Sequence, residues 1–229
     1  MTTICANLQA VRSRIAAAAQ RAGRRREDIA LLAVSKTVAA ERIDEAVAAG
    51  QRAFGENYAQ EGIGKIAALA ALDLEWHFIG PLQSNKTRPV AEHFDWVHSI
   101  ERFKVAERLS VARRGGLPPL QVCVQVNVSG ESSKSGVSPE EAASLAHAVA
   151  ALPNLRLRGL MTIPEPSEDA SLVRRRFAML RQLRDRLNAG GLALDTLSMG
   201  MSHDLEEAIL EGATIVRVGT AIFGERARA

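Results

Sequence analysis

The sequence predicts an α/β fold, a single (β/α)8 barrel of the TIM type with an extra helix at the N-terminus. Short apolar segments alternate with segments of helical periodicity from residue 30 to the end of the chain, and no region contains strands alone. A length of 229 residues is one at which α/β barrels fold as a unit. Residues 30–35 form a short, mostly aliphatic run, as is typical of a parallel strand buried on both faces.

The elements follow one another in a regular order. Apolar side chains at Ile4, Leu8, Val11 and Ile15 predict a helix over residues 3–22 with one buried face. The following run Arg24-Arg25-Arg26 is expected to be a solvated turn. Strands are expected at 30–35, 52–55, 75–79, 95–99, 120–126, 155–160, 195–198 and 214–218. Helices are expected at 40–49, 57–69, 84–92, 101–113, 139–151, 169–188 and 204–211, with glycine or proline near most of their ends.

We expect residues 1–229 to form one domain, because no linker-like segment, repeat or low-complexity tract divides the chain. The main competing architecture is an open, doubly wound sheet, which has the same alternation of strands and helices. The helix at 169–188 contains many arginines, and its apolar stripe runs through Val173, Phe177, Leu180 and Leu187. We expect these arginines to lie on the solvated face rather than to bind an anionic partner. They are Arg174, Arg175, Arg176, Arg181, Arg184 and Arg186.

Composition excludes several classes of function. A formal charge of +3 and an aromatic content of 4% do not favour nucleic-acid binding. No apolar run approaches the roughly 20 residues that span a bilayer, and the N-terminus lacks the charged segment of a secretion signal, so a cytoplasmic location without membrane contact is expected. Cys5, in an expected helix, and Cys123, in an expected strand, do not form a disulfide framework. The five histidines show no metal-ligand spacing, so no metal site is expected.

Lys36 is the principal candidate for chemistry among the five lysines. Side chains alternate along a strand, so Lys36 faces the same side as Val34 and Leu32. If that side is the barrel interior, burial lowers the pKa of the amine and favours the neutral form that adds to an aldehyde. The alternative is a lysine at a strand end that extends its ammonium into solvent.

The segments after the last two strands are typical of phosphate-binding loops in such barrels. Ser202 stands in a glycine-containing turn that opens the helix at 204–211, where backbone N–H groups and a hydroxyl suit an anion. Gly219 allows close approach of the backbone to a ligand, and Thr220 supplies a hydroxyl and an N–H. Taken singly, Ser202 is better explained as a helix cap and Gly219 as a turn glycine, and it is their joint occurrence after adjacent strands that favours phosphate binding.

Three further groups of polar residues are expected at the same end of the barrel. Arg217 alternates with Ile215 and should point inward, where its own loop offers no acid, so that a nitrogen or oxygen of a bound cofactor would serve as its partner. Glu56 and Asn57 follow the strand at 52–55 and are both expected at this mouth. The segments 77–86, 127–136 and 159–162 lie at the ends of other strands and are not specific by themselves.

Seven segments together closely resemble the pyridoxal phosphate homeostasis protein family, single-domain relatives of the alanine racemase barrel. They span nearly the whole chain in order, and their joint occurrence is specific: AVSKT around Lys36, FGENY at 54–58, HFIGPLQSNK at 77–86, VNVSGESSKSG at 126–136, LRGLMTIP at 157–164, LSMGMS at 197–202 and VRVGTAIFG at 216–224.

The resemblance implies a barrel that binds pyridoxal 5′-phosphate as an internal aldimine on Lys36. It further implies phosphate contacts from Ser202, Gly219 and Thr220, Arg217 facing the pyridine nitrogen and Asn57 near the ring. Two positions depart from the family pattern: His203 stands where the family often has an acid, and Val38 where it often has a basic residue. The first lies at the edge of the phosphate loop and the second bears on a surface-side contact, so neither affects the core site.

Three classes of function are compatible with these residues. The family resemblance favours a non-catalytic carrier or regulator that buffers the cofactor or supplies it to apo enzymes. A racemase-like enzyme is the second class, but alanine racemases take a tyrosine base from a separate β-domain, whereas this chain has only Tyr58. The third is a lyase or aldolase that uses Lys36 on a sugar phosphate without a cofactor.

Overall fold

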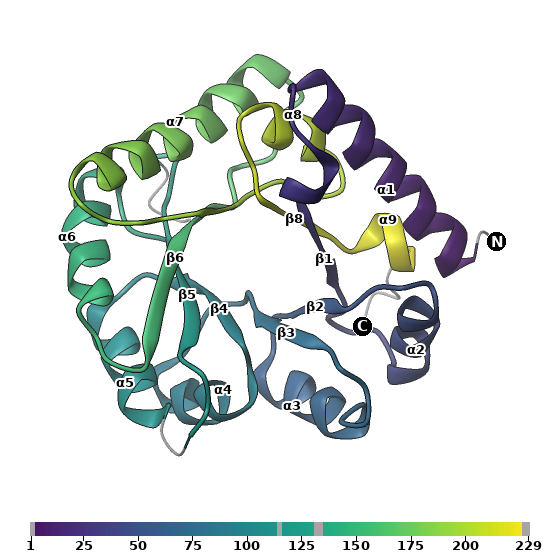
Figure 1. Ribbon diagram of the computed structural model, residues 1–229, viewed down its shortest axis with the longest axis horizontal. Coiled ribbons are helices and arrows are strands. Elements are labelled where there is room, and N and C mark those ends of the chain that lie inside the picture. Colours follow the sequence, from purple (N-terminus) through teal and green to yellow (C-terminus); the bar gives the residue numbers. More distant parts are fainter. Residues whose placement is uncertain (1–2, 114–115, 131–134, 226–229) are drawn as a thin grey trace.

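The computed structural model describes residues 3–113, 116–130 and 135–225. Its centre is a closed barrel in which eight parallel strands pair in sequence order and β1 also pairs with β8 (Figure 1). The strands are β1 (Ala30–Val34), β2 (Ala53–Glu56), β3 (Glu75–Phe78), β4 (Trp96–Ile100), β5 (Leu120–Gln125), β6 (Leu155–Met161), β7 (Thr196–Ser198) and β8 (Ile215–Val218). The barrel prediction is therefore confirmed, and the open-sheet alternative is wrong because the edge strands are paired.

Helices surround the barrel, as Figure 1 shows. They are α1 (Ile4–Arg21), α2 (Ala40–Ala48), α3 (Ala59–Ala68), α4 (Thr87–His93), α5 (Phe103–Ala112), α6 (Pro139–Ala150), α7 (Ala170–Ala189), α8 (Leu205–Leu210) and α9 (Thr220–Phe223), with short 3₁₀ turns η1 (Arg26–Asp28) and η2 (Ser84–Lys86). All the expected helices are present, whereas α9 and the two 3₁₀ turns were not predicted. We call the end at which the strands begin the lower mouth, and the end at which they finish the upper mouth.

The additional helix α1 packs beside α8 and α9, closing the barrel wall next to the last two strands (Figure 1). Thr3 caps its first turn by accepting a hydrogen bond from the Ala6 N–H, as a threonine at this position does. Its predicted apolar face, which includes Leu8 and Ile15, is fully buried. Beyond its end, Arg24 is not the solvated residue that we expected, because its guanidinium donates to the carbonyl oxygens of Ile209 and Ala213.

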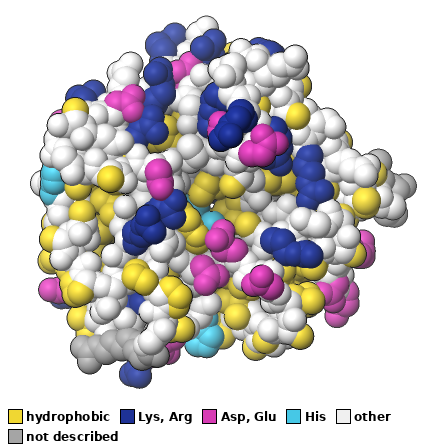
Figure 2. All heavy atoms as spheres, in the orientation of Figure 1, with side chains coloured by type: hydrophobic (Ala, Val, Ile, Leu, Met, Phe, Trp, Pro, Cys, Tyr) yellow, Lys and Arg dark blue, Asp and Glu magenta, His cyan; other side chains and the backbone are white. Residues whose placement is uncertain are grey.

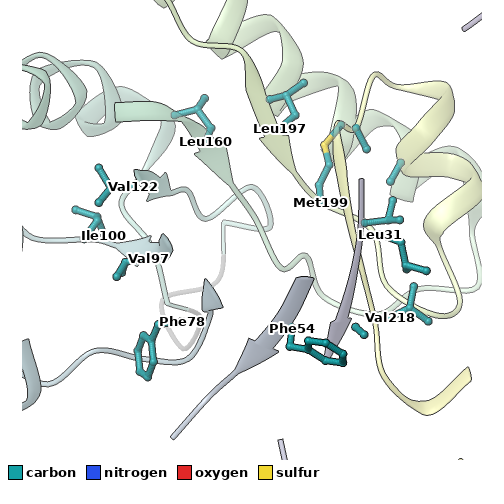
Figure 3. Packing of buried hydrophobic residues seen from close by; sticks show 14 of the residues in the cluster. Leu31, Phe54, Phe78, Val97, Ile100, Val122, Leu160, Leu197, Met199 and Val218 are labelled. Atoms are coloured by element: carbon teal, nitrogen blue, oxygen red, sulfur yellow. The ribbon is translucent and has the colours of Figure 1, made fainter. Parts of the chain in front are cut away.

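Side chains alternate between two apolar layers. Those on the outer side of the strands, such as Leu31 and Phe54, pack against the helices in one large cluster (Figure 3). Those on the inner side, such as Leu32 and Val34, join Ile215 in a small cluster inside the barrel. A second interior cluster consists of Trp96, Cys123 and Met161. The alternation that the sequence predicted for β1 is thus present, and it directs the residues at the strand ends.

The arginines of α7 are not all on its solvated face. The predicted apolar stripe is buried, but Arg176 is only 9% exposed and donates to the carbonyl oxygen of Glu165 at 2.8 Å. Arg174 and Arg181 both pair with Glu211. The expectation was wrong for Arg176 because this position lies three residues after Val173 and four before Leu180, on the apolar stripe itself.

Charged and apolar side chains are mixed on the surface, with acidic and basic groups gathered near the centre of the face in Figure 2. Within the described part of the chain, no helix has both the length and the apolar character of a membrane span. Cys5 is exposed and Cys123 is buried, and both are free thiols.

Candidate functional site

The six residues predicted to bind a cofactor line one cavity of about 150 Å³ at the upper mouth of the barrel. They come from the ends of β1, β2 and β8 and from the loop after β7: Lys36, Asn57, Ser202, Arg217, Gly219 and Thr220. The apolar side chains of Val34, Ile79, Ile163 and Met201 complete the wall, together with His203. Lys36 and Thr220, which are 184 positions apart in the sequence, thus meet, because all the strands of a parallel barrel finish at the same mouth.

Lys36 lies two residues beyond the end of β1 and is half-buried. It faces the interior, as predicted, because it continues the alternation of Leu32 and Val34. The next residue, Thr37, has φ of 61°, in the left-handed region that non-glycine residues rarely adopt. Its N–H donates to the carboxylate of Glu61 in α3, and this hydrogen bond ties the strained turn to the barrel wall.

Arg217 is 3% exposed, and burial lowers its pKa to about 10, so it remains charged at neutral pH. Its hydrogen-bond partners among the described residues are neutral: Nη1 donates to Oγ of Ser198 and Nη2 to the carbonyl oxygen of Thr162, each at 2.8 Å. The protein itself therefore supplies acceptors from β7 and from the end of β6, which the sequence did not indicate. A guanidinium has five N–H donors and no acceptor, so this group keeps the capacity to donate toward the cavity.

Asn57 supplies a polar atom that the protein leaves without a partner. Its Oδ1 is buried and makes no hydrogen bond with the described residues. Such an atom carries a desolvation cost unless a ligand or a water donates to it. The backbone of Asn57 is fixed by close packing against Gly80, where a Cβ would overlap the Asn57 carbonyl oxygen. Asn57 is therefore held rigidly at the cavity wall.

The loops that carry Ser202 and Thr220 are both tied to α1. Arg14 forms an ion pair with Glu206 at 2.7 Å and donates to the carbonyl oxygen of Ser202 at 3.0 Å. Asn7 donates to the carbonyl oxygen of Ile222, in the turn that follows Thr220, at 2.8 Å. The extra helix thus positions both predicted phosphate-binding loops, a role that its apolar periodicity alone did not indicate.

Glu56 does not line the cavity, so the expectation that it accompanies Asn57 at the mouth is wrong. It is fully buried on the outer side of β2, where its Oε1 accepts from Oγ of Ser35 at 2.6 Å and from Nζ of Lys65 at 2.8 Å. Its other oxygen, Oε2, has no partner among the described residues, and burial raises the pKa of this carboxyl group despite its two donors. Lys65, for which the sequence predicted no role, also donates to the carbonyl oxygen of Ser35 and to Glu61.

The described polar residues of the other segments that the sequence placed at this mouth do not line the cavity. Ser84 and Asn85 line an outer groove between α4 and α5. Residues 131–134, including Ser133 and Lys134, lie outside the described residues. Of the two departures, His203 is exposed at the cavity, whereas Val38 is buried in the outer apolar cluster. No group of three potential ligands among the described histidines, cysteines and acids is placed to hold a metal ion.

The chain matches the family described as "Alanine racemase, N-terminal domain" over residues 6–227. It is 62% identical to the pyridoxal phosphate homeostasis protein of Pseudomonas aeruginosa over 226 residues, which cover 99% of this chain and 97% of that protein. It is 55% identical to the protein of the same name from Escherichia coli K12, covering 99% and 98% of the two chains.

Solved structures also resemble this chain. PipY of Synechococcus elongatus, in a structure with PLP bound, superimposes with a TM-score of 0.85 at 38% identity, over 97% of this chain and all of PipY. Alanine racemase of Corynebacterium glutamicum shares the fold, with a TM-score of 0.68 at 19% identity over 96% of this chain and 61% of the racemase.

The fold and these matches define a barrel of the alanine racemase N-terminal type. Within that class, the chain belongs to the pyridoxal phosphate homeostasis protein family, as the shared motifs predicted.

Proposed function

We propose that this chain, as a single barrel domain over residues 1–229, binds pyridoxal 5′-phosphate as a Schiff base on Lys36 and acts in homeostasis of this cofactor. In this proposal it buffers the cofactor or supplies it to apo enzymes and is not itself an enzyme. The names of its relatives and the PLP-bound structure of PipY support the choice of ligand.

The observation that carries the proposal is the convergence of all six predicted residues on one cavity around Lys36. The donor set suits the cofactor. Ser202 and Thr220 offer hydroxyl groups for a phosphate, and the first N–H groups of a helix, such as those that follow Gly219, have no intrahelical acceptor. Arg217 offers N–H donors to a ring nitrogen, and Asn57 presents an unpartnered buried oxygen to any donor on the ligand.

The cofactor, when bound, supplies an aldehyde and an electron-withdrawing ring. The residues of this chain favour holding it over using it. Arg217 is charged and can only donate, so it favours an unprotonated pyridine nitrogen and a weaker electron sink. The single tyrosine, Tyr58, is 58% exposed and does not line the cavity, which leaves no counterpart of a racemase tyrosine base at the described wall.

The test is covalent trapping on the whole protein. After loading with pyridoxal 5′-phosphate and reduction with borohydride, peptide mass mapping should find the pyridoxyl group on the peptide that contains Lys36, and the K36A variant should not yield it. An adduct on another lysine alone, or none in the parent, would overturn the assignment.

A second measurement separates a carrier from an enzyme. The loaded protein should transfer its cofactor to a cofactor-free enzyme and restore that enzyme's activity, without racemising alanine or cleaving a sugar phosphate itself. Substantial turnover by protein freed of contaminating enzymes, or cofactor-independent cleavage, would contradict the proposed role.

A further inference from the structure

A continuous chain of hydrogen bonds crosses the barrel interior below the candidate site. Oε1 of Glu75 lies 2.6 Å from Nε2 of His77, and Nδ1 of His77 lies 2.9 Å from Nε2 of His98. Nδ1 of His98 lies 2.8 Å from Oγ of Ser198, which accepts from Arg217 at 2.8 Å. The members come from β3, β4, β7 and β8, so the chain runs across the barrel rather than along one strand.

The two ends of this chain lie at opposite mouths. Glu75 and His77 line a cavity of about 490 Å³ at the lower mouth, and the Glu75 side chain is 52% exposed there. Arg217 lines the candidate cavity at the upper mouth. Between them, His98 and Ser198 are both fully buried. This chain of hydrogen bonds is therefore open to solvent at its lower end and reaches the candidate site at its upper end.

The chemistry of the end groups limits where the hydrogens lie. The guanidinium of Arg217 has donors only, so Ser198 must accept from it. Burial holds the pKa of His98 well below its usual value, and the charges of His77 and Arg217 act in the same direction, so His98 carries a single ring hydrogen. The hydrogen bond to His77 lowers the pKa of Glu75, which keeps it a carboxylate and an acceptor. Two arrangements of the remaining hydrogens then satisfy every contact.

In the first arrangement both imidazoles are neutral. Ser198 donates its O–H to Nδ1 of His98, the Nε2–H of His98 donates to Nδ1 of His77, and the Nε2–H of His77 donates to Glu75. Every hydrogen bond then points from the upper mouth to the lower mouth.

In the second arrangement the chain holds one more proton, and His77 is an imidazolium. It donates from one ring nitrogen to Glu75 and from the other to Nε2 of His98. His98 remains neutral but now carries its hydrogen on Nδ1 and donates it to Ser198. Ser198 accepts from both His98 and Arg217 and turns its own hydrogen away from His98. One added proton thus changes the tautomer of His98 and reverses the two middle hydrogen bonds, those of His98 with His77 and with Ser198.

We propose that Glu75, His77, His98 and Ser198 form a relay that passes the protonation state of the lower mouth to Arg217. None of the four lines the candidate cavity, so they act as positioning residues for Arg217. The relay goes beyond the proposed function, because its two arrangements are properties of the chain without a ligand.

Other charged groups near the relay are fixed by partners of their own. Arg158 pairs with Asp195 at 2.6 Å and lies 5.0 Å above the ring of Trp96, which stacks on His77. Burial raises the pKa of Cys123 to about 12, so it is a neutral thiol. The charged and titratable groups that face the relay from neighbouring elements are Arg24, Asp28, Asp95, Cys123, Arg158, Asp195 and Arg217.

The test is nitrogen NMR of ligand-free protein with ¹⁵N-labelled histidine, because protonated and unprotonated ring nitrogens give well-separated signals. As the pH is lowered, the appearance of doubly protonated His77 should coincide with movement of the His98 hydrogen from Nε2 to Nδ1, while His98 stays neutral. A His98 that keeps one tautomer throughout, or that becomes doubly protonated together with His77, overturns the relay.

Substitutions at the two ends of the relay test whether a change at one end alters protonation at the other. S198A removes one hydrogen bond from each arrangement, but Arg217, which has donors only, remains beside His98 and favours an unprotonated Nδ1. The second arrangement, which needs an acceptor for the Nδ1–H of His98, is therefore disfavoured, and the midpoint for His77 should move to lower pH. Ser198 and His77 each form a hydrogen bond with His98 and, within the described structure, none with each other, so such a shift must pass through His98. E75Q removes the counter-charge of the imidazolium and should also lower the midpoint.

The matched control is S99A, which removes a neighbouring buried hydroxyl that donates to the Gly80 carbonyl and not to the relay. It should leave the midpoint unchanged. If the S198A midpoint coincides with that of the parent and of S99A, the proposal fails, whatever the result for E75Q.

Discussion

The ammonium of Lys65 lies 2.8 Å from the carboxylate of Glu56, and both side chains are buried on the outer side of the strand end that carries Lys36. The same ammonium donates to the carbonyl oxygen of Ser35 and to Glu61, which in turn accepts from the N–H of Thr37. The residues immediately before and after Lys36 are therefore both held by one buried charge cluster. This cluster fixes the backbone from which Lys36 reaches the cavity.

Replacement of Lys65 by methionine should lower the free energy of unfolding by about 3 kcal/mol, because it leaves Glu56 buried without its cationic partner. Urea denaturation measures the loss. The double variant K65M/E56Q should recover part of it, since a neutral amide costs less to bury than a carboxylate. K104M in α5, where the lysine is exposed, is the control and should change little. A loss below about 1 kcal/mol for K65M would contradict a structural role for this pair.

S202A and T220A should each weaken the binding of pyridoxal 5′-phosphate by about 1.5–3 kcal/mol, the range for a hydrogen bond to a charged group. This corresponds to a dissociation constant raised by about 10- to 150-fold. Titration followed by absorbance measures it. S171A, at the exposed start of α7, is a matched control that should bind as the parent does. Parent-like affinity in both S202A and T220A would place the phosphate elsewhere.

R14M should weaken cofactor binding about tenfold, because Arg14 holds the Ser202 carbonyl and Glu206 without lining the cavity. The control is R12M on the same helix, since Arg12 donates instead to the carbonyl oxygen of Ala49 at the end of α2. Both variants lose an arginine from α1, so a difference between them isolates the contact with the loop. Equal affinities in R14M and R12M would argue against positioning by α1.

Much of the fold followed from the sequence because alternation and helical periodicity are local properties. The apolar run before Lys36 predicted both the first strand and the direction of the lysine, and the strand ends are correct to within one residue. The barrel then brings Ser202, Arg217 and Thr220 to the same mouth without any further assumption.

Two errors came from incomplete use of the same rules. On β2, Gly55 faces the interior, where a Cβ would contact Leu32 and Ile79, so Glu56 must face outward. Strict alternation of side chains along β2 therefore predicts that Glu56 faces away from the cavity. On α7, Arg176 falls within the apolar stripe by spacing, and the charge of its side chain obscured this.

The interior relay could not be predicted in the same way. His77 and His98 lie 21 residues apart on adjacent strands, and their contact depends on the register in which His77 pairs with Trp96. Register between parallel strands is set by packing across the whole barrel and has no local sequence pattern.

Burial of His98 predicts how stability depends on pH. Its pKa in the folded state is depressed by desolvation, whereas in the unfolded state it returns to about 6.5. Below that pH the unfolded chain binds a proton at this position that the folded chain does not, so the free energy of unfolding falls as the pH falls. The contribution reaches about 1.4 kcal/mol per pH unit below the unfolded-state value. Above about pH 7 neither state is protonated at His98 and the contribution is constant.

Denaturation curves of the parent and of H98Q at several pH values between 5 and 8 measure this contribution as a difference. Glutamine keeps a donor and an acceptor but does not titrate, so H98Q should be less stable than the parent at pH 8, with the gap narrowing as the pH falls toward 5. H147Q, on the exposed face of α6, is the control and should keep the slope of the parent. Parallel stability curves for the parent and H98Q over this range would mean that His98 binds a proton as readily in the folded chain as in the unfolded one, against the neutral imidazole that its burial requires.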